Sequence, residues 1–283
     1  MPRIVLQVLA AAFAVLACGL ATAQAASTAS SSVVAESAPL PPDQISQEIK
    51  DALAAVDRPA ADKALDAGRR PEQMLAFFGI RPGMKVADLF AGGGYTTELL
   101  SRVVGPTGTV YSQEPVFPPE SQQIEQVWST RLSQPTFKNV IAVHKSFGSD
   151  DLLPVKPGSL DAIIINMNYH DLVLLGVDRD KLNAEMFRAL KPGGVYGIVD
   201  HSAKAGSGLK DISLHRIDEG LLVNEVETAG FRLAAASGAL RHPEDDRTWV
   251  TAPQAAGARR GTSDRFMIKF VKPQFRGGLR GPG

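Results

Sequence analysis

The segment from Val86 to Glu98 constrains the fold of this chain more than any other part of it. An apolar run, Val86–Leu89, leads through Phe90 and Ala91 into three consecutive glycines, Gly92–Gly94, and a helical stretch begins at Thr96. Glycines let a chain turn sharply after a strand, and they let a ligand lie directly on the backbone. Free N–H groups at the start of the following helix favour an anionic part of that ligand. The segment therefore predicts a ligand-binding strand–turn–helix unit.

Beyond Lys85, short apolar runs alternate with helical stretches, which predicts an α/β, Rossmann-like domain over residues 81–273. We expect a mostly parallel sheet with helices on both faces. Its seven strands are expected at Val86–Leu89, Thr109–Gln113, Val140–His144, Ala162–Asn166, Val195–Val199, Arg232–Ser237 and Phe266–Val271. The helices between them are expected at Thr96–Val104, Ser121–Leu132, Asp178–Leu190 and Ile212–Ala229. No helix separates the last two strands, so the last strand is expected to be antiparallel. Residues 43–80 read as N-terminal helices, with Asp43 as an N-cap.

The two ends of the chain have compositions that differ from the rest. Arg3, the apolar run Val8–Ala21 and the small residues of Ala23–Ala25 predict a signal peptide over residues 1–25, too short to span a bilayer. Val15–Cys18 loosely resembles a lipoprotein box, which makes lipidation at Cys18 a less favoured alternative, as is an uncleaved anchor. The Ser- and Ala-rich residues 26–42 and the Gly- and Arg-rich residues 274–283 predict a disordered linker and a disordered tail.

Composition excludes several classes of function. The chain has 30 basic and 30 acidic residues, whereas a nucleic-acid-binding protein normally carries a basic excess. Its only cysteine, Cys18, lies in the predicted signal peptide, so the mature chain would have no thiol for catalysis or metal binding. No later segment is apolar enough to cross a membrane. We therefore expect a periplasmic or secreted protein that acts on a small molecule.

The kind of ligand follows from the residues around the glycines. Glu114 ends the second strand about 20 residues after Gly94, where an acid binds a ribose diol in nucleotide-binding folds. A dinucleotide-binding turn would have a third glycine where this chain has Thr97, and no phosphate-binding lysine follows the turn. The pattern therefore predicts a nucleoside ligand without a pyrophosphate.

These features, in order, resemble the class I S-adenosylmethionine-dependent methyltransferase superfamily over Arg81–Pro273. The resemblance rests on Asp88–Gly94, Glu114, Leu160–Asn166, Arg188–Gly194 and Glu227–Phe231. The leader, the triplet Tyr169–Asp171 and the triplet Asp264–Phe266 further resemble an exported group of bacterial methyltransferase-like proteins. The resemblance implies S-adenosylmethionine as the cofactor and methyl transfer to a small-molecule acceptor by in-line displacement.

The expected site residues follow from this resemblance and from the strand ends. The expected cofactor-binding residues are Asp88, Phe90, Gly92, Gly93, Gly94, Glu114 and Asn166. The carboxyl ends of the fourth and fifth strands place Tyr169, His170 and Asp171 at the acceptor as the catalytic candidates, with Asp200–Ser202 as a further candidate segment. The segment His215–Asp218 is expected on a helix as a solvated face or an internal salt bridge. No metal site is expected, because nothing in the spacing of His144, His170, Asp171 and His201 demands one.

Two other functions stay open. A noncatalytic exported protein that binds a nucleoside or another small ligand is the main alternative, because S-adenosylmethionine is made in the cytoplasm and an exported enzyme needs a supply of it. An NAD-linked oxidoreductase is disfavoured by Thr97 and by the elements Leu190–Gly194 and Phe266–Val271.

Overall fold

The computed structural model of the chain describes residues 34–115 and 122–274. The predicted signal peptide lies outside these residues, as do residues 26–33 of the predicted linker and residues 275–283 of the predicted tail. Within the two described ranges, no helix has the length and apolar character needed to cross a membrane.

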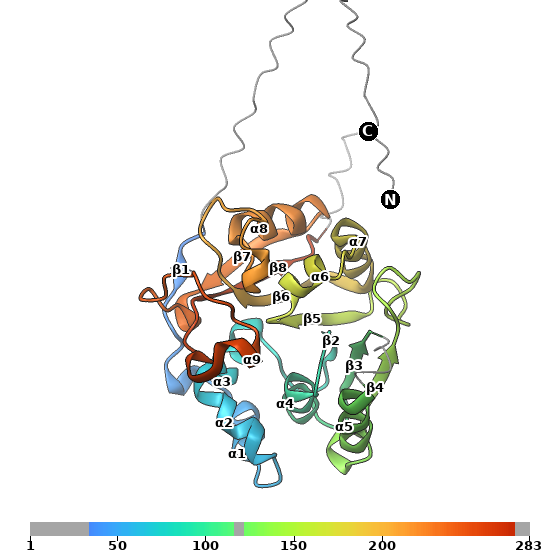
Figure 1. Cartoon of the computed structure of the whole chain (residues 1–283). Coiled ribbons are helices and arrows are strands. Elements are labelled where there is room, and N and C mark those ends of the chain that lie inside the picture. The colour runs from blue at the N-terminus through green and yellow to red at the C-terminus, as the bar shows by residue number, and fades with distance from the viewer. Residues whose placement is uncertain (1–33, 116–121, 275–283) are drawn as a thin grey trace, which may run out of the picture. The chain divides into compact units, whose positions relative to one another are not determined.

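The described residues form one eight-stranded sheet with the order β1-β7-β8-β6-β5-β2-β3-β4 (Figure 1). Its strands are β1 (Glu36–Ser37), β2 (Lys85–Leu89), β3 (Thr109–Glu114), β4 (Val140–His144), β5 (Leu160–Asn166), β6 (Leu190–His201), β7 (Arg232–Ser237) and β8 (Arg265–Val271). Only β8 runs antiparallel, between β6 and β7. The predicted fold class is confirmed, since all seven expected strands are present and the last one is antiparallel.

The eighth strand, β1, corrects the prediction for part of the linker. Glu36 and Ser37 pair in parallel with Ala236 and Ser237 of β7. Arg241 anchors the segment through an ion pair with Glu36. The prediction failed here because the free backbone groups of the sheet edge order this segment, and its Ser/Ala-rich composition does not reveal them.

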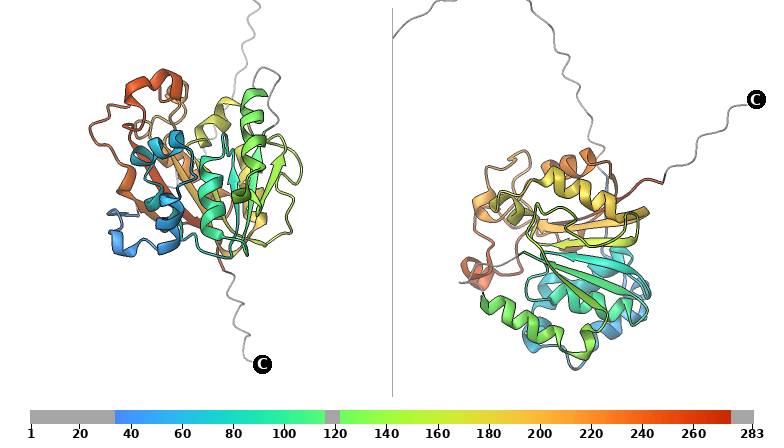
Figure 2. Two further views of the ribbon diagram at one scale, coloured as in Figure 1. Left: turned by 90° about the horizontal axis from the view of Figure 1, so that it is seen from below. Right: turned by 90° about the vertical axis from the view of Figure 1, so that its right-hand side faces the viewer.

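Helices cover both faces of the sheet, which the right-hand view of Figure 2 shows between two helical layers. One layer holds the N-terminal helices together with two later ones: α1 (Gln47–Ala54), α2 (Ala60–Arg69), α3 (Pro71–Phe78), α4 (Tyr95–Val104) and α5 (Gln122–Leu132). The other layer holds α6 (Tyr169–Leu174), α7 (Arg179–Ala189) and α8 (Glu219–Thr228). The N-terminal helices are thus part of the domain's own cover.

Each layer has its own hydrophobic core, and neighbouring residues of a strand alternate between the two. Val86 and Ile164 pack with α1, α3 and α4, whereas Ala87 and Ile163 pack with α6, α7 and α8. This alternation is the period-2 geometry of a strand. It explains why the central strands read as continuous apolar runs, because both of their faces are buried.

The predicted helix Ile212–Ala229 is wrong in its first half. A short 3-10 turn, η4 (Ile212–Leu214), ends at His215 in the left-handed conformation with φ of +53°. Helix α8 begins only after Asp218, whose side chain accepts hydrogen bonds from the backbone N–H groups of Gly220 and Leu221. Asp218 is thus an N-cap that starts a new helix, and the apolar pattern alone runs across it.

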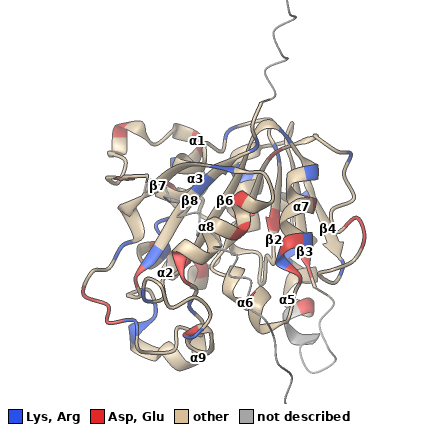
Figure 3. Cartoon of the chain, turned by 90° about the horizontal axis from the view of Figure 1, so that it is seen from above, with Lys and Arg blue, Asp and Glu red and all other residues tan. Residues whose placement is uncertain are grey.

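The segment between β7 and β8 folds back over α2. It contains α9 (Pro253–Ala256) and η6 (Gly257–Arg259). Arg265, which is 1% exposed, donates hydrogen bonds to the carbonyls of Gly68 and Gly261 and so fixes the segment to the helix. In Figure 3, basic and acidic residues are interspersed over the visible face, as the balanced composition suggests.

Candidate functional site

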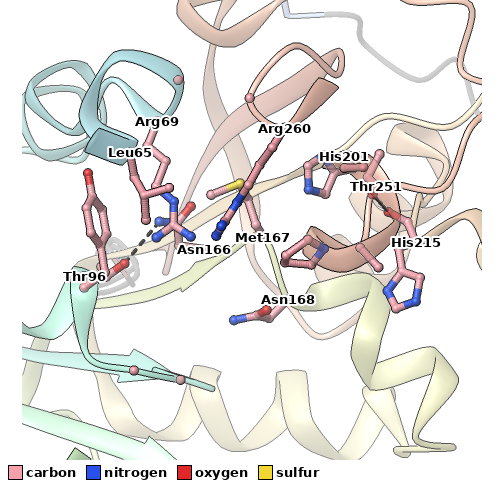
Figure 4. Close-up of a pocket in the computed structure, with 18 of the residues that line it drawn as sticks. Leu65, Arg69, Thr96, Asn166, Met167, Asn168, His201, His215, Thr251 and Arg260 are labelled. Atoms are coloured by element: carbon pink, nitrogen blue, oxygen red, sulfur yellow. Dashed lines mark hydrogen bonds between the residues drawn. The ribbon is translucent and has the colours of Figure 1, made fainter. Parts of the chain in front are cut away.

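A cavity of about 700 Å³ opens at the carboxyl ends of β2, β5 and β6. The turn after β2, the segment after β5, helix α2 and the segment before β8 all contribute to its wall. Figure 4 shows Thr96 and Leu65 near one end, His201 and His215 at the other, and Asn166, Met167 and Asn168 between them. The cavity thus joins the predicted cofactor turn to the predicted catalytic triplet. We call its two ends the glycine end and the histidine end.

Gly92 and Gly93 form an open floor at the glycine end. Gly92 has φ of +60°, and a Cβ atom added to either residue would meet no other atom within 4 Å. Gly94 has a different role, because a Cβ atom there would lie 2.1 Å from Cζ3 of Trp128. Gly94 therefore lets α5 approach α4, while Gly92 and Gly93 leave room for a ligand on the backbone.

Asp88 and Thr97 stabilise this turn from beneath. The Thr97 hydroxyl donates a hydrogen bond of 2.6 Å to the Asp88 carboxylate, and both residues are buried. Burial raises the pKa of Asp88 to about 7, although the Thr97 bond opposes that rise. Thr97, which a dinucleotide-binding turn would replace with glycine, is here the partner of the motif's acid. The short polar side chain of Thr97, just after the glycines, could have indicated a hydrogen bond to Asp88 from the sequence alone.

Glu114 is buried at the end of β3. Glu114 is 1% exposed, and neither carboxyl oxygen accepts a hydrogen bond of ordinary geometry from the residues that the structure describes. Burial, together with the nearby Asp88 carboxylate, raises the pKa of Glu114 to about 9, although the backbone N–H of Gly92 nearby opposes that rise. A buried polar group without a partner is costly, so this carboxyl group fits a ligand that brings hydroxyl donors to it.

The segment after β5 forms the middle of the cavity. Asn166 donates a hydrogen bond of 3.1 Å to the Thr96 hydroxyl. Asn168 donates one of 2.7 Å to the carbonyl of Phe90, whose φ is +54°. Both contacts tie the end of β5 to the turn after β2. Of the seven predicted cofactor-binding residues, Asp88, Phe90, Gly92, Gly93 and Asn166 line the cavity. Gly94 and Glu114 are not among the residues that line it.

His170 lies at the centre of the histidine end with both ring nitrogens engaged. Its Nδ1 donates to Oδ1 of Asp200 over 2.6 Å, and Oδ2 of the same carboxylate accepts from the backbone N–H of His170. Its Nε2 lies 3.2 Å from Oδ1 of Asp171 and 3.3 Å from Nδ1 of His215. Burial alone would lower the pKa of His170, but the carboxylates of Asp200 and Asp171 raise it to about 10.

His201 is the second predicted histidine that lines the cavity. Its Nδ1 shares a hydrogen bond of 2.8 Å with the Ser263 hydroxyl, and its ring centre lies 5.7 Å from that of His170. Burial and the positive charges of His170 and Arg265 hold the pKa of His201 well below its usual range. Within the described ranges its Nε2 has no hydrogen-bond partner, which leaves a neutral nitrogen available to a ligand.

Tyr169 does not face the cavity, contrary to the sequence-based expectation. Its side chain is fully buried, and its hydroxyl donates to Glu225 and accepts from Asn183. The reason is geometric, because successive residues of a helix point in directions about 100° apart. When His170 points into the cavity, Tyr169 points toward α7 and α8.

His215 is the site residue that the sequence did not reveal. Its Nδ1 lies 3.1 Å from Oδ1 of Asp171, and its carbonyl accepts a hydrogen bond of 2.6 Å from the Thr251 hydroxyl. The contact with Asp171 crosses more than forty positions of the chain, so no short motif carries it. Arg216, the next residue, forms the internal salt bridge that was one of two expectations, with Asp245 at 2.8 Å.

Solved structures place this chain in the fold of S-adenosylmethionine-dependent methyltransferases. One of them is a methyltransferase of this kind from Aquifex aeolicus, with a TM-score of 0.54 and 19% identity. That comparison covers 75% of this chain and 95% of the other one. At this level of identity the comparison shows the fold alone.

Curated relatives carry a more particular name. The chain is 31% identical over 134 residues to the ubiquinone/menaquinone biosynthesis C-methyltransferase UbiE of Legionella pneumophila strain Paris, which covers 47% of this chain and 49% of the relative. The protein of the same name from Pasteurella multocida is 30% identical over 175 residues, which covers 59% and 60% of the two chains. The chain thus spans about half the length of the first curated relatives that it matches. No protein-family model matches it.

Proposed function

We propose that this protein transfers a methyl group from S-adenosylmethionine to a small-molecule acceptor. The proposal rests above all on the buried carboxyl group of Glu114, which lies near the backbone N–H of Gly92 and has no hydrogen-bond partner of ordinary geometry among the described residues. A ligand with a ribose diol would satisfy Glu114, and its flat adenosine part would find room on the glycines. The methyltransferase fold and the names of the curated relatives support the same conclusion.

The cofactor's amino-acid part fits the middle of the cavity. Asn166 lies there, and Figure 4 shows Arg69 and Arg260 extending into the same region. Arg69 lies over the Tyr95 ring at 4.4 Å, and within the described residues neither arginine has a carboxylate within salt-bridge distance. A ligand carboxylate would supply that missing charge.

S-adenosylmethionine supplies a methyl group on a positively charged sulfur, which is a good leaving group. The protein's tasks are to align the acceptor at about 3 Å from that carbon and to exclude water. The histidine end has groups for this. His170, with both nitrogens engaged, suits positioning, whereas the free Nε2 of His201 suits contact with the acceptor.

Calorimetric titration of the full chain with S-adenosylhomocysteine tests cofactor binding without turnover. We expect binding that weakens about 10- to 100-fold in Glu114→Gln, because a charge-assisted hydrogen bond contributes about 1.5–3 kcal/mol. Glu185→Gln is the matched control, since Glu185 pairs with Arg188 outside this cavity and should leave the affinity unchanged. Wild-type protein that gives no heat, or equal affinity in Glu114→Gln, would contradict the proposal.

A noncatalytic role as a small-ligand-binding protein is the competing function. It predicts that the natively produced protein co-purifies with a different ligand, which mass spectrometry of the extracted small molecules would identify. Recovery of S-adenosylmethionine or S-adenosylhomocysteine would support the transferase instead.

We also propose that the chain belongs with exported methyltransferase-like proteins and acts in the periplasm or outside the cell. The support is the signal-like pattern of residues 1–25, with Ala23–Ala25 as the cleavage site. N-terminal sequencing of the protein from fractionated cells tests this. An Ala26 N-terminus in the periplasmic fraction is expected, whereas a mature chain that starts at a lipidated Cys18 would support the alternative.

A further inference from the structure

We propose that His170, Asp171 and His215 form a binding site for a divalent transition-metal ion at the histidine end of the cavity. All three residues line the cavity. The inference replaces the sequence-based expectation of no metal site, because that expectation considered His144 and His201 and placed His215 on a separate helix.

The three potential ligand atoms form a nearly equilateral triangle. Nε2 of His170 lies 3.2 Å from Oδ1 of Asp171, and Nδ1 of His215 lies 3.1 Å from that oxygen. The two imidazole nitrogens are 3.3 Å apart. An ion about 2.1 Å from each atom would see them at angles of about 100°. Such angles lie between those of tetrahedral and facial octahedral coordination, so an ion fits with little movement.

Asp200 supplies the outer support that a ligating histidine needs. Its carboxylate, which is fully buried, accepts from Nδ1 and from the backbone N–H of His170. With the Nδ1 proton committed to Asp200, a metal ion would displace the proton from Nε2, whose lone pair then faces the triangle. Metal-binding histidines usually have such a carboxylate on the other nitrogen.

The backbone of His215 supplies a second, independent observation. This residue is held in the left-handed region at φ of +53°. The Thr251 hydroxyl bonds to its carbonyl, and the Thr251 N–H bonds to the carbonyl of Leu214. Residues in sparsely populated conformations gather at functional sites, where the surrounding structure holds them in place. Here that conformation turns an imidazole toward another imidazole and a carboxylate.

The donor set indicates which ions would bind. Two imidazoles and one carboxylate suit Zn²⁺, Co²⁺, Fe²⁺ or Mn²⁺ better than Mg²⁺ or Ca²⁺, which prefer oxygen ligands throughout. Three protein ligands on one side of the ion leave its other positions to the cavity. The ligand class for those positions is a small molecule with an oxygen or nitrogen donor.

Titration of the metal-stripped full chain, purified without a histidine tag, with Co²⁺ tests the site. We expect visible d–d absorption that saturates at one equivalent of Co²⁺, and competition by Zn²⁺. His215→Ala should abolish the stoichiometric band, and Asp200→Asn should weaken binding about 10- to 100-fold. His144→Ala is the control, because His144 lies exposed on β4 outside the cavity and should leave the band unchanged.

The competing possibility is that the triangle is only a network around a doubly protonated His170. In that case wild-type protein gives no stoichiometric Co²⁺ band, or His215→Ala gives the same band, and either result overturns the proposal. If metal-free His215→Ala unfolds at the same temperature as the metal-free wild type, the variant is folded, and the lost absorption band means that a metal ligand has been removed. S-adenosylhomocysteine binding is measured separately, in the presence of a chelator that removes the metal. A negative result for metal binding therefore leaves the test of cofactor binding intact, and the reverse also holds.

Discussion

The two ends of the cavity are encoded in different ways. The glycine end comes from one continuous unit, in which β2, the turn, α4 and β3 bring Gly92, Thr97 and Glu114 together within thirty positions of the chain. The histidine end combines His170, His201 and His215, which follow β5, end β6 and close a separate loop. Local backbone rules therefore fix the first end, whereas long-range contacts fix the second. Perturbations should be separable in the same way.

The largest expected effect is at the histidine end, where Arg216 and Asp245 form a buried ion pair. Their side chains are 0% and 1% exposed, and Arg216 also donates to the carbonyls of Ser202 and Trp249. Arg216→Leu leaves the Asp245 carboxylate buried without its charge partner, which should reduce the free energy of unfolding by about 3–5 kcal/mol. Urea denaturation measures this loss.

The control for that variant is a pair with more exposure. Arg188 and Glu185 are 30% and 17% exposed, so Arg188→Leu should cost less than about 1 kcal/mol. Where Arg216→Leu is still folded, we expect its affinity for S-adenosylhomocysteine to match the wild type. Loss of that affinity in folded protein would show that the two ends are not independent.

The next largest effect is at the glycine end, and it separates two adjacent residues. Gly94→Ala places a methyl group 2.1 Å from Trp128 at a φ of +79°, so we expect a loss of roughly 2–4 kcal/mol in stability. In Gly93→Ala the added methyl group meets no atom within 4 Å, so the stability should not change. The methyl group should, however, occupy space where the ligand would lie on the backbone, and so weaken binding. Thermal unfolding and calorimetric titration of both variants measure the two effects. If Gly93→Ala binds S-adenosylhomocysteine with wild-type affinity, the glycines serve packing alone.

Sequence reasoning was accurate where local rules decide the structure. The strand, turn and helix around Gly92–Gly94 begin and end within one residue of their predicted positions. Even there, the sequence did not predict that Thr97 donates a hydrogen bond to Asp88. The dinucleotide-binding pattern assigns that position only a role in helix packing.

At the histidine end, the sequence identifies candidate residues but does not show which way their side chains point. Tyr169 and His170 are neighbours in one helix, and only the packing of α7 and α8 decides which of them points into the cavity. The position of His215 depends on the cap formed by Asp218 and on the bond from Thr251. The first of these signals is local and could have been used. The second joins segments that are far apart in the chain and cannot be read from a single sequence.

The smallest expected effect at the glycine end is a dependence of the free energy of unfolding on pH that the ionisation of Glu114 causes. Its pKa is about 9 in the folded protein against an ordinary value of 4.5, so the folded state holds a proton that the unfolded state releases. The resulting stabilisation is complete below pH 4.5 and is lost as the pH rises toward 9. Near neutrality the loss should be about 1.4 kcal/mol per pH unit.

Glu114→Gln removes this titration but leaves the histidine end intact, so the difference between the two proteins isolates the carboxyl group. We expect urea denaturation at pH 6.5 and 7.5 to show a wild type that loses stability relative to Glu114→Gln as the pH rises. Asp88, whose pKa is raised to about 7, titrates in both proteins, and its charge adds to the raised pKa of Glu114 in the wild type. Saturating S-adenosylhomocysteine should reduce this slope, since ribose hydroxyls donate to the ionised carboxylate and lower its pKa. Parallel pH profiles for the two proteins would mean that Glu114 is already ionised and has a partner, and the strongest support for the ribose site would be lost.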